Sequence, residues 1–410
     1  MPRAGPILIL GPASRPYSYA RIIRSLVSRL AHRYEFHQFA IDATAPTPGH
    51  EHVIHFNSVP GDVYGVEQLP ALIAAVRPAI LWVINDMWLY FAHMNRLRSC
   101  AKDVRVILYA PIDGVNLSPA FARALEGVSR LVLFTQFAKR VFETAVGRLA
   151  EAEGLPPSRL PDIALIPHGV DTDRFRPCED IAEGGLGARR SARRALFPDR
   201  AGLEDAFIVL NANQNNMRKR LDLTIEGFAR FAEGKPKNVL LYLHTNAWQR
   251  GAELVPIARA CGITDRLLLT GSGRQAPDLT DGRLNLIYNA CDVGLNTSLG
   301  EGWGMVAFEH GATRAAQVMP RHSACEELWV DAGVLLEAPE VVRHRHDAVE
   351  YRATTPERVA AALEALYASP SYRLERASAA YVNATDPKYS WNGIAAQWDA
   401  LFEETVGRAR

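Results

Sequence analysis

The chain has 410 residues, of which 48% are hydrophobic and 22% charged, and its formal net charge is +1. This composition excludes a disordered chain, and the balanced charge gives no support for general nucleic-acid binding. The length is too great for one ordinary hydrophobic core, so it predicts two domains.

Short apolar runs alternate with helical patterns along most of the chain, which is typical of parallel α/β sheets. In the first half, a helix is expected over residues 20–33, where Ile22, Leu26 and Leu30 fall on one face. The strands predicted in this half are 7–10, 79–84, 104–110, 131–134 and 163–166. The polar segment 178–200, rich in glycine and arginine, interrupts the alternation and is predicted to be a linker.

The alternation begins again after this segment. The predicted strands are 207–210, 239–244, 266–270, 293–296, 316–319 and 333–336, and the predicted helices are 221–231, 356–368, 371–382 and 391–406. Two doubly wound domains are therefore expected, an N-terminal one over residues 1–178 and a C-terminal one over residues 179–390. Ligands bind such sheets beyond the carboxyl ends of the strands, so function is expected in the loops that follow the strands.

Cysteine usage and hydropathy suggest where the protein acts. The five cysteines are dispersed without a CxxC pair, which predicts reduced thiols in the cytoplasm. No stretch approaches the ~20 apolar residues that span a bilayer, so membrane contact is expected to be at most peripheral, on the inner face. Residues 1–150 hold 16 Lys/Arg and 10 Asp/Glu, a net charge of +6. This excess fits solvated helix faces, or else contact with an anionic acceptor or a membrane surface.

The strongest functional signal follows the predicted strand 293–296. Gly302 and Gly304 lie where a strand turns into a helix, and glycine lets the backbone approach a ligand closely. The positive end of the helix would favour an anion such as a diphosphate. Glu301 lies before the helix and Glu309 about two turns along it, so both could accept hydrogen bonds from an extended ligand. The alternative is an ordinary strand–turn–helix junction with incidental acids.

A second signal lies between the predicted strand 207–210 and helix 221–231. The basic triplet Arg218, Lys219 and Arg220 precedes the start of a helix, where a cation is unfavourable for the helix dipole unless an anion binds. Charge-assisted hydrogen bonds from such side chains to phosphate contribute ~1.5–3 kcal/mol each. A solvated loop is the alternative.

The acidic segment resembles the E-G-[FWY]-G-x-x-x-x-E signature of retaining GT-B glycosyltransferases of family 4. This resemblance implies two Rossmann-like domains that face each other across a cleft, a nucleotide-sugar co-substrate linked to UDP or GDP, and no cofactor. In the family, the first acid contacts donor sugar hydroxyls and the second binds the ribose, which assigns these roles to Glu301 and Glu309. The donor-binding residues expected from this segment are Gly302, Trp303, Gly304, Met305 and Glu309, and Glu301 is expected to be catalytic.

The basic segment is similar to the family's G-R-x(4–5)-K-G stretch, whose arginine and lysine hold the departing diphosphate. Lys219 matches the lysine and is expected to be catalytic. The family arginine would fall near Asn213, which is therefore a donor-binding candidate, and Arg220 stands where the family has glycine. Either Arg218 or Arg220 could therefore take over the role of the arginine.

Two further segments extend the resemblance. Residues 166–177 are similar to the I-P-[NH]-G-V-D-x-x-x-F-x-P segment at the end of the family's first domain. Asp171 and Asp173 would read in isolation as a D-x-D metal site, but their place in this segment argues against that, and no metal is expected. The helix 391–406 resembles the terminal helix of the family, which packs back on the first domain.

The N-terminal domain is expected to bind the acceptor. Asn85, Asp86 and Trp88 follow the predicted strand 79–84, and Asp113 follows the next strand. An aromatic ring can cover a sugar, although Trp88 could equally be a packing residue, and a carboxylate can hydrogen-bond the acceptor hydroxyl. Asp113 is therefore a third catalytic candidate. On the donor side, Ser323 stands where relatives often carry a glycine-rich loop, and it is a candidate to bind the donor with the amides of Ala324 and Cys325.

The resemblance, together with these residues, implies a retaining glycosyltransferase that transfers a sugar from a nucleotide diphosphate to an acceptor hydroxyl, by a front-face mechanism without metal. Lys219 and nearby arginines would neutralise the charge that grows on the diphosphate. The acceptor stays open among glycans, lipid carriers and small metabolites. The alternatives are a sugar-nucleotide epimerase or phosphorylase of the same fold, or a non-catalytic nucleotide-sugar-binding protein.

Overall fold

Contacts within the chain separate two units. Unit 1 comprises Met1–Gly169, Arg345–Val349 and Lys388–Arg410, and unit 2 comprises Val170–His344 and Glu350–Pro387. The first boundary between the two units lies after Gly169, whereas the sequence pattern places the domain boundary after residue 178. The computed structural model describes residues 5–13, 18–41, 53–62, 64–100, 103–154, 156–178, 186–200, 202–246, 251–271, 279–343 and 349–407.

A seven-stranded parallel sheet forms the centre of unit 1, in the order β3-β2-β1-β4-β5-β6-β7. Its strands are β1 (Ile7–Gly11), β2 (Phe36–Ala40), β3 (Val53–Asn57), β4 (Ile80–Ile84), β5 (Arg105–Tyr109), β6 (Arg130–Leu133) and β7 (Asp162–Leu165). The strand order reverses between β1 and β4, so the crevice where such sheets bind ligands lies at the carboxyl ends of these two strands.

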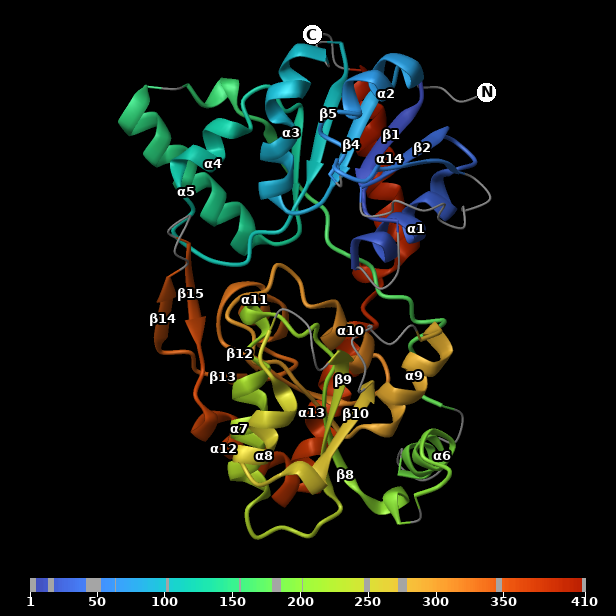
Figure 1. Ribbon diagram of the computed structural model, residues 1–410, viewed down its shortest axis with the longest axis vertical. Helices are drawn as coiled ribbons and strands as arrows, with labels where there is room; N and C mark the ends of the chain where they lie inside the picture. The colour runs from blue at the N-terminus through green and yellow to red at the C-terminus, as the bar shows by residue number, and fades with distance from the viewer. Residues whose placement is uncertain are drawn as a thin grey trace. The chain divides into compact units, whose positions relative to one another are not determined.

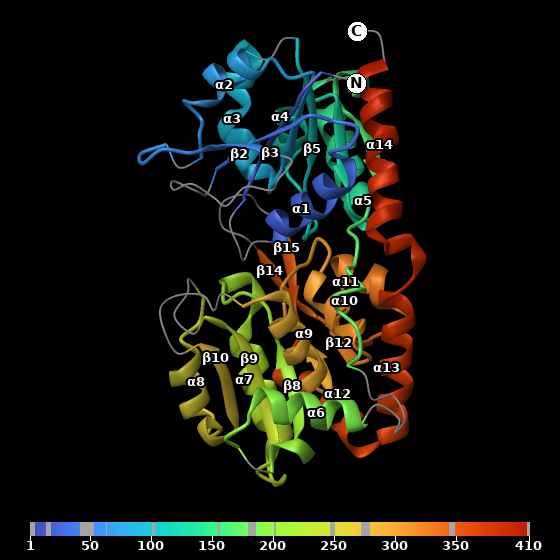
Figure 2. The ribbon, with the colours of Figure 1, turned by 90° about the vertical axis from the view of Figure 1, so that its right-hand side faces the viewer.

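The α-helices described in unit 1 are α1 (Ser18–Leu30), α2 (Leu69–Val76), α3 (Met87–Cys100), α4 (Pro119–Ala124), α5 (Gln136–Glu153) and α14 (Trp391–Gly407). Figure 2 shows α1 and α14 side by side on one face of the sheet, and α2 and α3 on the other. Trp398 of α14 is fully buried, with its ring 4.5 Å from that of Trp82 and 4.9 Å from that of Tyr109. The C-terminal helix is therefore part of the core of unit 1.

Unit 2 has a six-stranded parallel sheet in the order β10-β9-β8-β11-β12-β13, and a separate antiparallel hairpin of β14 and β15. The strands are β8 (Phe207–Asn211), β9 (Val239–Asn246), β10 (Leu267–Gly271), β11 (Val293–Leu295), β12 (Ala316–Pro320), β13 (Val334–Leu336), β14 (Glu340–Arg343) and β15 (Glu350–Ala353). The order reverses between β8 and β11, which makes the carboxyl ends of these two strands the expected ligand-binding edge.

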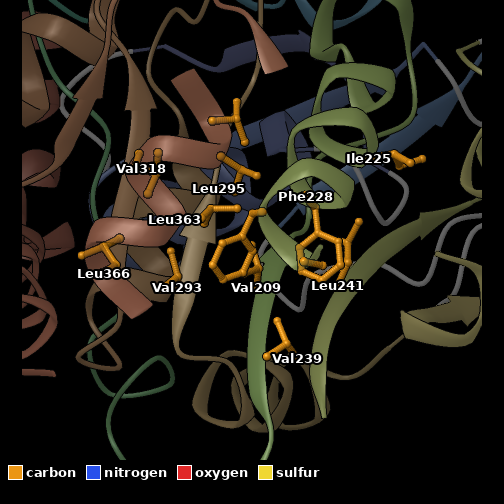
Figure 3. Packing of buried hydrophobic residues seen from close by; sticks show 14 of the residues in the cluster. Val209, Ile225, Phe228, Val239, Leu241, Val293, Leu295, Val318, Leu363 and Leu366 are labelled. Carbon is orange, nitrogen blue, oxygen red and sulfur yellow. The ribbon is translucent and has the colours of Figure 1, made fainter. Parts of the chain in front are cut away.

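The helices of unit 2 are α6 (Leu186–Leu196), α7 (Leu221–Ala232), α8 (Leu254–Ala260), α9 (Asp281–Ala290), α10 (Met305–Gly311), α11 (Ser323–Trp329), α12 (Pro356–Ala368) and α13 (Pro370–Ala384). Figure 1 shows α7, α8 and α12 on one side of the sheet and α6 and α9 on the other. The core of unit 2 lies between the sheet and the helices α7 and α12, and it includes Val209, Phe228, Leu241 and Leu363 (Figure 3). Among the described residues, no helix combines the length and the apolar character needed to cross a membrane.

The prediction of a linker over residues 178–200 is wrong for its second half. Helix α6 packs against α9, and Arg193 of α6 is buried with its Nη2 atom 2.6 Å from Oδ2 of Asp292. Arg193 also donates to the carbonyl oxygen of Ala290 at 2.8 Å. The arginine-rich composition that suggests a solvated linker instead supplies buried ion pairs and hydrogen bonds.

Buried histidines predict a loss of stability in mild acid. Burial lowers the pKa of His310 to about 3, and that of His244 and of His322 to about 4. The unfolded chain takes up protons at these histidines near the ordinary pKa of 6.5. The free energy of unfolding therefore keeps its full value above that pH and decreases as the pH is lowered toward 4. We expect each histidine to cost about 2 kcal/mol of unfolding free energy at pH 5.

Urea unfolding at pH 7 and pH 5 measures this loss. The variant His310→Asn carries no titrating group at this position, so it should lose about 2 kcal/mol less than the wild-type protein over the same interval. Equal losses in the two proteins would show that His310 does not contribute to the pH dependence.

Candidate functional site

The two segments singled out in the sequence meet at the carboxyl edge of the unit 2 sheet. The first follows β8 and ends in a 3₁₀ turn over Met217–Lys219, and the second follows β11. The amide of Leu299 donates to the carbonyl oxygen of Arg218 at 2.8 Å. The Nζ atom of Lys219 lies 2.5 Å from Oε1 of Glu301. The topology therefore joins the acidic and basic segments in one site at the switch point of the sheet.

Asparagine side chains shape the loop that carries Lys219. Oδ1 of Asn211 accepts hydrogen bonds from the backbone and side-chain nitrogens of Asn213, at 3.0 and 2.9 Å. Oδ1 of Asn216 accepts the amide of Lys219 at 3.1 Å and caps the 3₁₀ turn. Such bonds from Asn to nearby backbone groups favour turns. The predicted donor-side residue Asn213 is buried and tied to the end of β8.

The two candidate arginines differ in conformation and in partners. Arg220 has φ +47°, in the left-handed region that glycine favours. Its guanidinium pairs with Asp222 at 2.7 Å. Arg218 instead contacts the carbonyl oxygen of Gly300, and its Nη1 atom lies 3.5 Å from Oε2 of Glu301. Only Arg218 of this pair therefore joins the contact between Lys219 and Glu301.

Charge and burial oppose each other at Glu301. Burial raises the pKa of its carboxyl group, but Lys219, Arg218 and hydrogen bonds outweigh burial and hold this pKa at about 2. Burial lowers the pKa of Lys219, and the adjacent carboxylate opposes this change. Glu301 is thus an ionised carboxylate at neutral pH, and it can accept hydrogen bonds but cannot donate them.

The two oxygens of Glu301 have different surroundings. Oε1 accepts three hydrogen bonds, from Lys219, from Nδ2 of Asn296 at 3.0 Å and from Oγ of Ser298 at 2.9 Å. Oε2 has its nearest described partner, Arg218, at 3.5 Å. Sequence analysis did not assign a role to Asn296 or Ser298. The signal that could have found them is their place directly after the buried strand β11.

Residues Gly302–Gly304 form a turn and not the start of a helix. Helix α10 begins only at Met305, after Gly304 with φ +94°. Glu309 therefore lies little more than one turn into α10, not two, and its Oε2 accepts the hydroxyl of Tyr288 at 2.9 Å. The indole of Trp303 is 3% exposed and stacks on Phe308 with ring centroids 5.0 Å apart, so it contributes packing.

Ser323 contacts the acidic segment directly. Its Oγ atom accepts the amide of Glu301 at 3.1 Å, and the amide of Ala324 donates to the carbonyl oxygen of Glu301 at 3.2 Å. The expectation that the amide of Ala324 is free for a ligand is therefore corrected, because the protein itself uses this group.

The acceptor-side candidates lie at the carboxyl ends of neighbouring strands of unit 1. Asn85 and Asp86 follow β4, and Asp113 follows β5. Oδ1 of Asp86 accepts the hydroxyl of Tyr19 at 2.7 Å, a residue that sequence analysis missed. The side chain of Trp88, at the start of α3, lies outside the described part of the chain.

Asp171, the first residue of the D-x-D pattern, has a protein partner in Arg174. Oδ2 of Asp171 lies 3.0 Å from Nε of Arg174, and its Oδ1 accepts the amide of the same residue at 3.3 Å. Across the described ranges, no group of three or more His, Cys, Asp or Glu side chains is arranged to hold a metal ion.

No protein-family model matches the sequence, and a search of curated proteins found no match either. Solved structures do match along the whole chain. The sucrose-phosphate synthase of Thermosynechococcus elongatus has a TM-score of 0.72 at 15% identity, with 98% of each chain covered. Anabaena HepE in complex with UDP and glucose has a TM-score of 0.70 at 15% identity, with 98% of this chain and 100% of that chain covered.

A third similar structure is that of WaaG, a glycosyltransferase involved in lipopolysaccharide biosynthesis, with a TM-score of 0.67 at 14% identity. It covers 96% of this chain, and 98% of its own length is matched. Together with the two parallel α/β sheets and their strand orders, these likenesses show that the chain has the GT-B fold.

Proposed function

We propose that this protein is a glycosyltransferase that moves a sugar from a nucleotide diphosphate to an acceptor hydroxyl, with retention of anomeric configuration and without a metal ion. The observation that carries the proposal is the 2.5 Å contact between Lys219 and Glu301 at the carboxyl ends of β8 and β11. The fold supports it, because similar structures were solved with UDP and glucose and with UDP-2-fluoroglucose.

The site offers a division of roles for the donor. Lys219 and Arg218 provide positive charge for the departing diphosphate, and such preorganised charge is usually the largest single contribution to catalysis. The ionised Glu301 accepts hydrogen bonds from sugar hydroxyls. Glu309 binds the ribose of the nucleotide. The backbone of Gly302–Met305 lines the donor between these two acids.

The acceptor is assigned to unit 1. Asn85 and Asp86 lie at its switch-point edge, and we propose that they bind the acceptor together with Trp88. Asp113 is proposed to hydrogen-bond the hydroxyl that attacks the sugar. A cytoplasmic location belongs to the same proposal and rests on the dispersed cysteines.

A thermal-shift panel of UDP-, GDP-, ADP- and TDP-sugars tests the donor assignment. A ligand present at 100 times its Kd stabilises the folded protein by about 2.7 kcal/mol, which raises Tm by several degrees. We expect nucleotide sugars of one base to stabilise the protein most. When that donor is then offered to a panel of acceptors, we expect its turnover to continue in the presence of EDTA. Conversion of the donor without an acceptor would instead indicate an epimerase, and binding without any turnover would indicate a binding protein.

The two arginines give a further prediction. Arg220→Gly places glycine at φ +47° and removes only a partly exposed ion pair, so stability should change by less than about 1 kcal/mol and donor affinity by less than about threefold. Arg218→Ala removes a charge beside Glu301 and should weaken donor binding at least tenfold, by about 1.4 kcal/mol or more. Titration calorimetry of both variants measures this contrast. Equal weakening by the two substitutions would contradict the assignment of Arg218.

A further inference from the structure

A closed ring of hydrogen bonds surrounds the turn that carries Glu301. Nε2 of His322 lies 3.1 Å from the carbonyl oxygen of Ser298, and its Nδ1 lies 3.0 Å from Oγ of Ser323. Oγ of Ser323 accepts the amide of Glu301 at 3.1 Å, and Oγ of Ser298 donates to the Glu301 carboxylate at 2.9 Å. All four residues are buried. The ring therefore joins the backbone at both ends of the turn to the side chain of Glu301.

The partners allow one arrangement of protons in this ring. A carbonyl oxygen can only accept, so Nε2 of His322 carries a hydrogen and donates it to Ser298. Burial keeps the imidazole neutral by lowering its pKa to about 4, so Nδ1 is an acceptor. The hydroxyl of Ser323 then donates to Nδ1 and accepts the amide of Glu301. Each polar group has the partner that its chemistry requires.

Ser323 adopts a conformation that serine rarely uses. Its φ is +50°, in the left-handed region, where a non-glycine residue is disfavoured. Glycine would adopt this backbone without cost, but it has no hydroxyl to bond the amide of Glu301. The presence of serine here is thus explained by the two hydrogen bonds of its side chain.

We propose that His322 and Ser323 form a positioning dyad, which holds the Ser298–Glu301 turn so that the Glu301 carboxylate is aimed at the sugar of the donor. The dyad acts through Glu301 and does not itself contact the substrate. This inference rests on the proposed function, because it assumes that Glu301 binds the donor sugar. It adds that recognition of the sugar, as opposed to the nucleotide, depends on two residues at the start of α11.

Ser323→Ala and Ser323→Gly separate the hydroxyl from the backbone conformation. Both remove the hydrogen bonds, but only glycine fits φ +50° without cost. In the free protein, the amide of Glu301 should exchange its hydrogen at least about tenfold faster in both variants than in the wild type, as measured on peptides that cover residues 298–302. The exchange rates of the other peptides of unit 2 should not change. If the Glu301 amide exchanged at the wild-type rate in Ser323→Gly, the proposal that the dyad fixes the Ser298–Glu301 turn would be wrong.

Donor binding tests the consequence. The probes are UDP-glucose against UDP and GDP-mannose against GDP, measured by titration calorimetry. The preference is the affinity for the nucleotide sugar divided by that for the free nucleotide, and it is compared for the pair in which the wild type shows it. In both Ser323 variants this ratio should fall at least about tenfold, while the affinity for the free nucleotide should change by less than about twofold. His322→Gln can still donate to the carbonyl oxygen of Ser298 and should retain more of this preference than His322→Ala.

Outcomes for the two proposals are distinct. If the wild type prefers the nucleotide sugar and the Ser323 variants share this preference fully, the dyad is refuted while the glycosyltransferase proposal stands. If the wild type binds no member of either pair, the assignment of a UDP- or GDP-linked donor fails, and hydrogen exchange still decides whether the dyad holds the turn. A purely structural role would weaken binding of nucleotide and nucleotide sugar alike, which also contradicts positioning.

Discussion

Replacing Lys219 with methionine is expected to lower turnover with the preferred nucleotide sugar by about 10²–10³-fold. The ammonium group lies against Glu301 in a buried site, where a positive charge stabilises an anionic leaving group far more than in water. Methionine fills much of the same volume, so the loss can be assigned to charge rather than to a cavity. Steady-state kinetics with a saturating acceptor measure kcat for the variant.

The same substitution should reduce stability, which provides an internal check. Removal of one partner from a buried ion pair typically costs 3–5 kcal/mol, and we expect about 3 kcal/mol here, since Asn296 and Ser298 still bond the carboxylate of Glu301. Urea unfolding measures this cost separately from turnover. Near-normal turnover in a folded Lys219→Met protein would remove Lys219 from the mechanism.

Glu301→Gln is expected to weaken recognition of the donor sugar strongly while preserving recognition of the nucleotide. Glutamine keeps the shape of the side chain but lacks the charge, and one of its two terminal groups donates instead of accepting. Loss of two charge-assisted hydrogen bonds to sugar hydroxyls should lower kcat/KM by about 10²–10³-fold. The measurement compares the affinity for the nucleotide sugar with that for the free nucleotide.

Glu309→Gln is the matched control for this prediction, because Glu309 is also a buried acid of the same segment. Its proposed partner is the ribose, so it should weaken nucleotide and nucleotide sugar equally. Glu301→Gln should therefore weaken binding of the nucleotide sugar alone, whereas Glu309→Gln should weaken binding of both ligands. If Glu301→Gln also weakened both ligands equally, Glu301 would not be the residue that contacts the sugar.

A double-mutant cycle examines the ion pair itself. Each single substitution leaves one buried charge without its main partner, whereas Lys219→Met combined with Glu301→Gln leaves neither. The double variant should therefore be more stable than the sum of the single effects implies, by at least about 1 kcal/mol. Additive losses would mean that the two charges do not stabilise each other in the folded protein.

Much of the fold could be predicted from the sequence, and the exceptions have physical causes. The helix over Pro356–Ala368 was predicted with these bounds, because proline and an amphipathic pattern mark it locally. Strand β2 was missed, because its His37 and Gln38 are polar although the strand is buried. The Nε2 atom of Gln38 donates to the carbonyl oxygen of Pro12 at 3.2 Å, a partner that only the folded chain supplies.

The hairpin of β14 and β15 escaped prediction for a different reason. Its strands are short, Ala353 is their one buried residue, and they lack the apolar run that marks a buried strand. The amide of Arg352 in β15 donates to the carbonyl oxygen of Leu299 at 3.1 Å, next to the acidic segment. A contact of this kind joins distant parts of the chain and has no local signal in the sequence.

The sequence by itself determined that the chain forms two parallel α/β sheets, and that Lys219 and Glu301 follow strands of the second, because apolar periodicity and turn residues are local properties. Only the tertiary structure decided that these two residues, 82 positions apart, form one ion pair. It alone also distinguished Arg218 from Arg220 and joined His322 and Ser323 to Glu301. The physical reason is that strand order, which no local pattern specifies, brings the ends of β8 and β11 together.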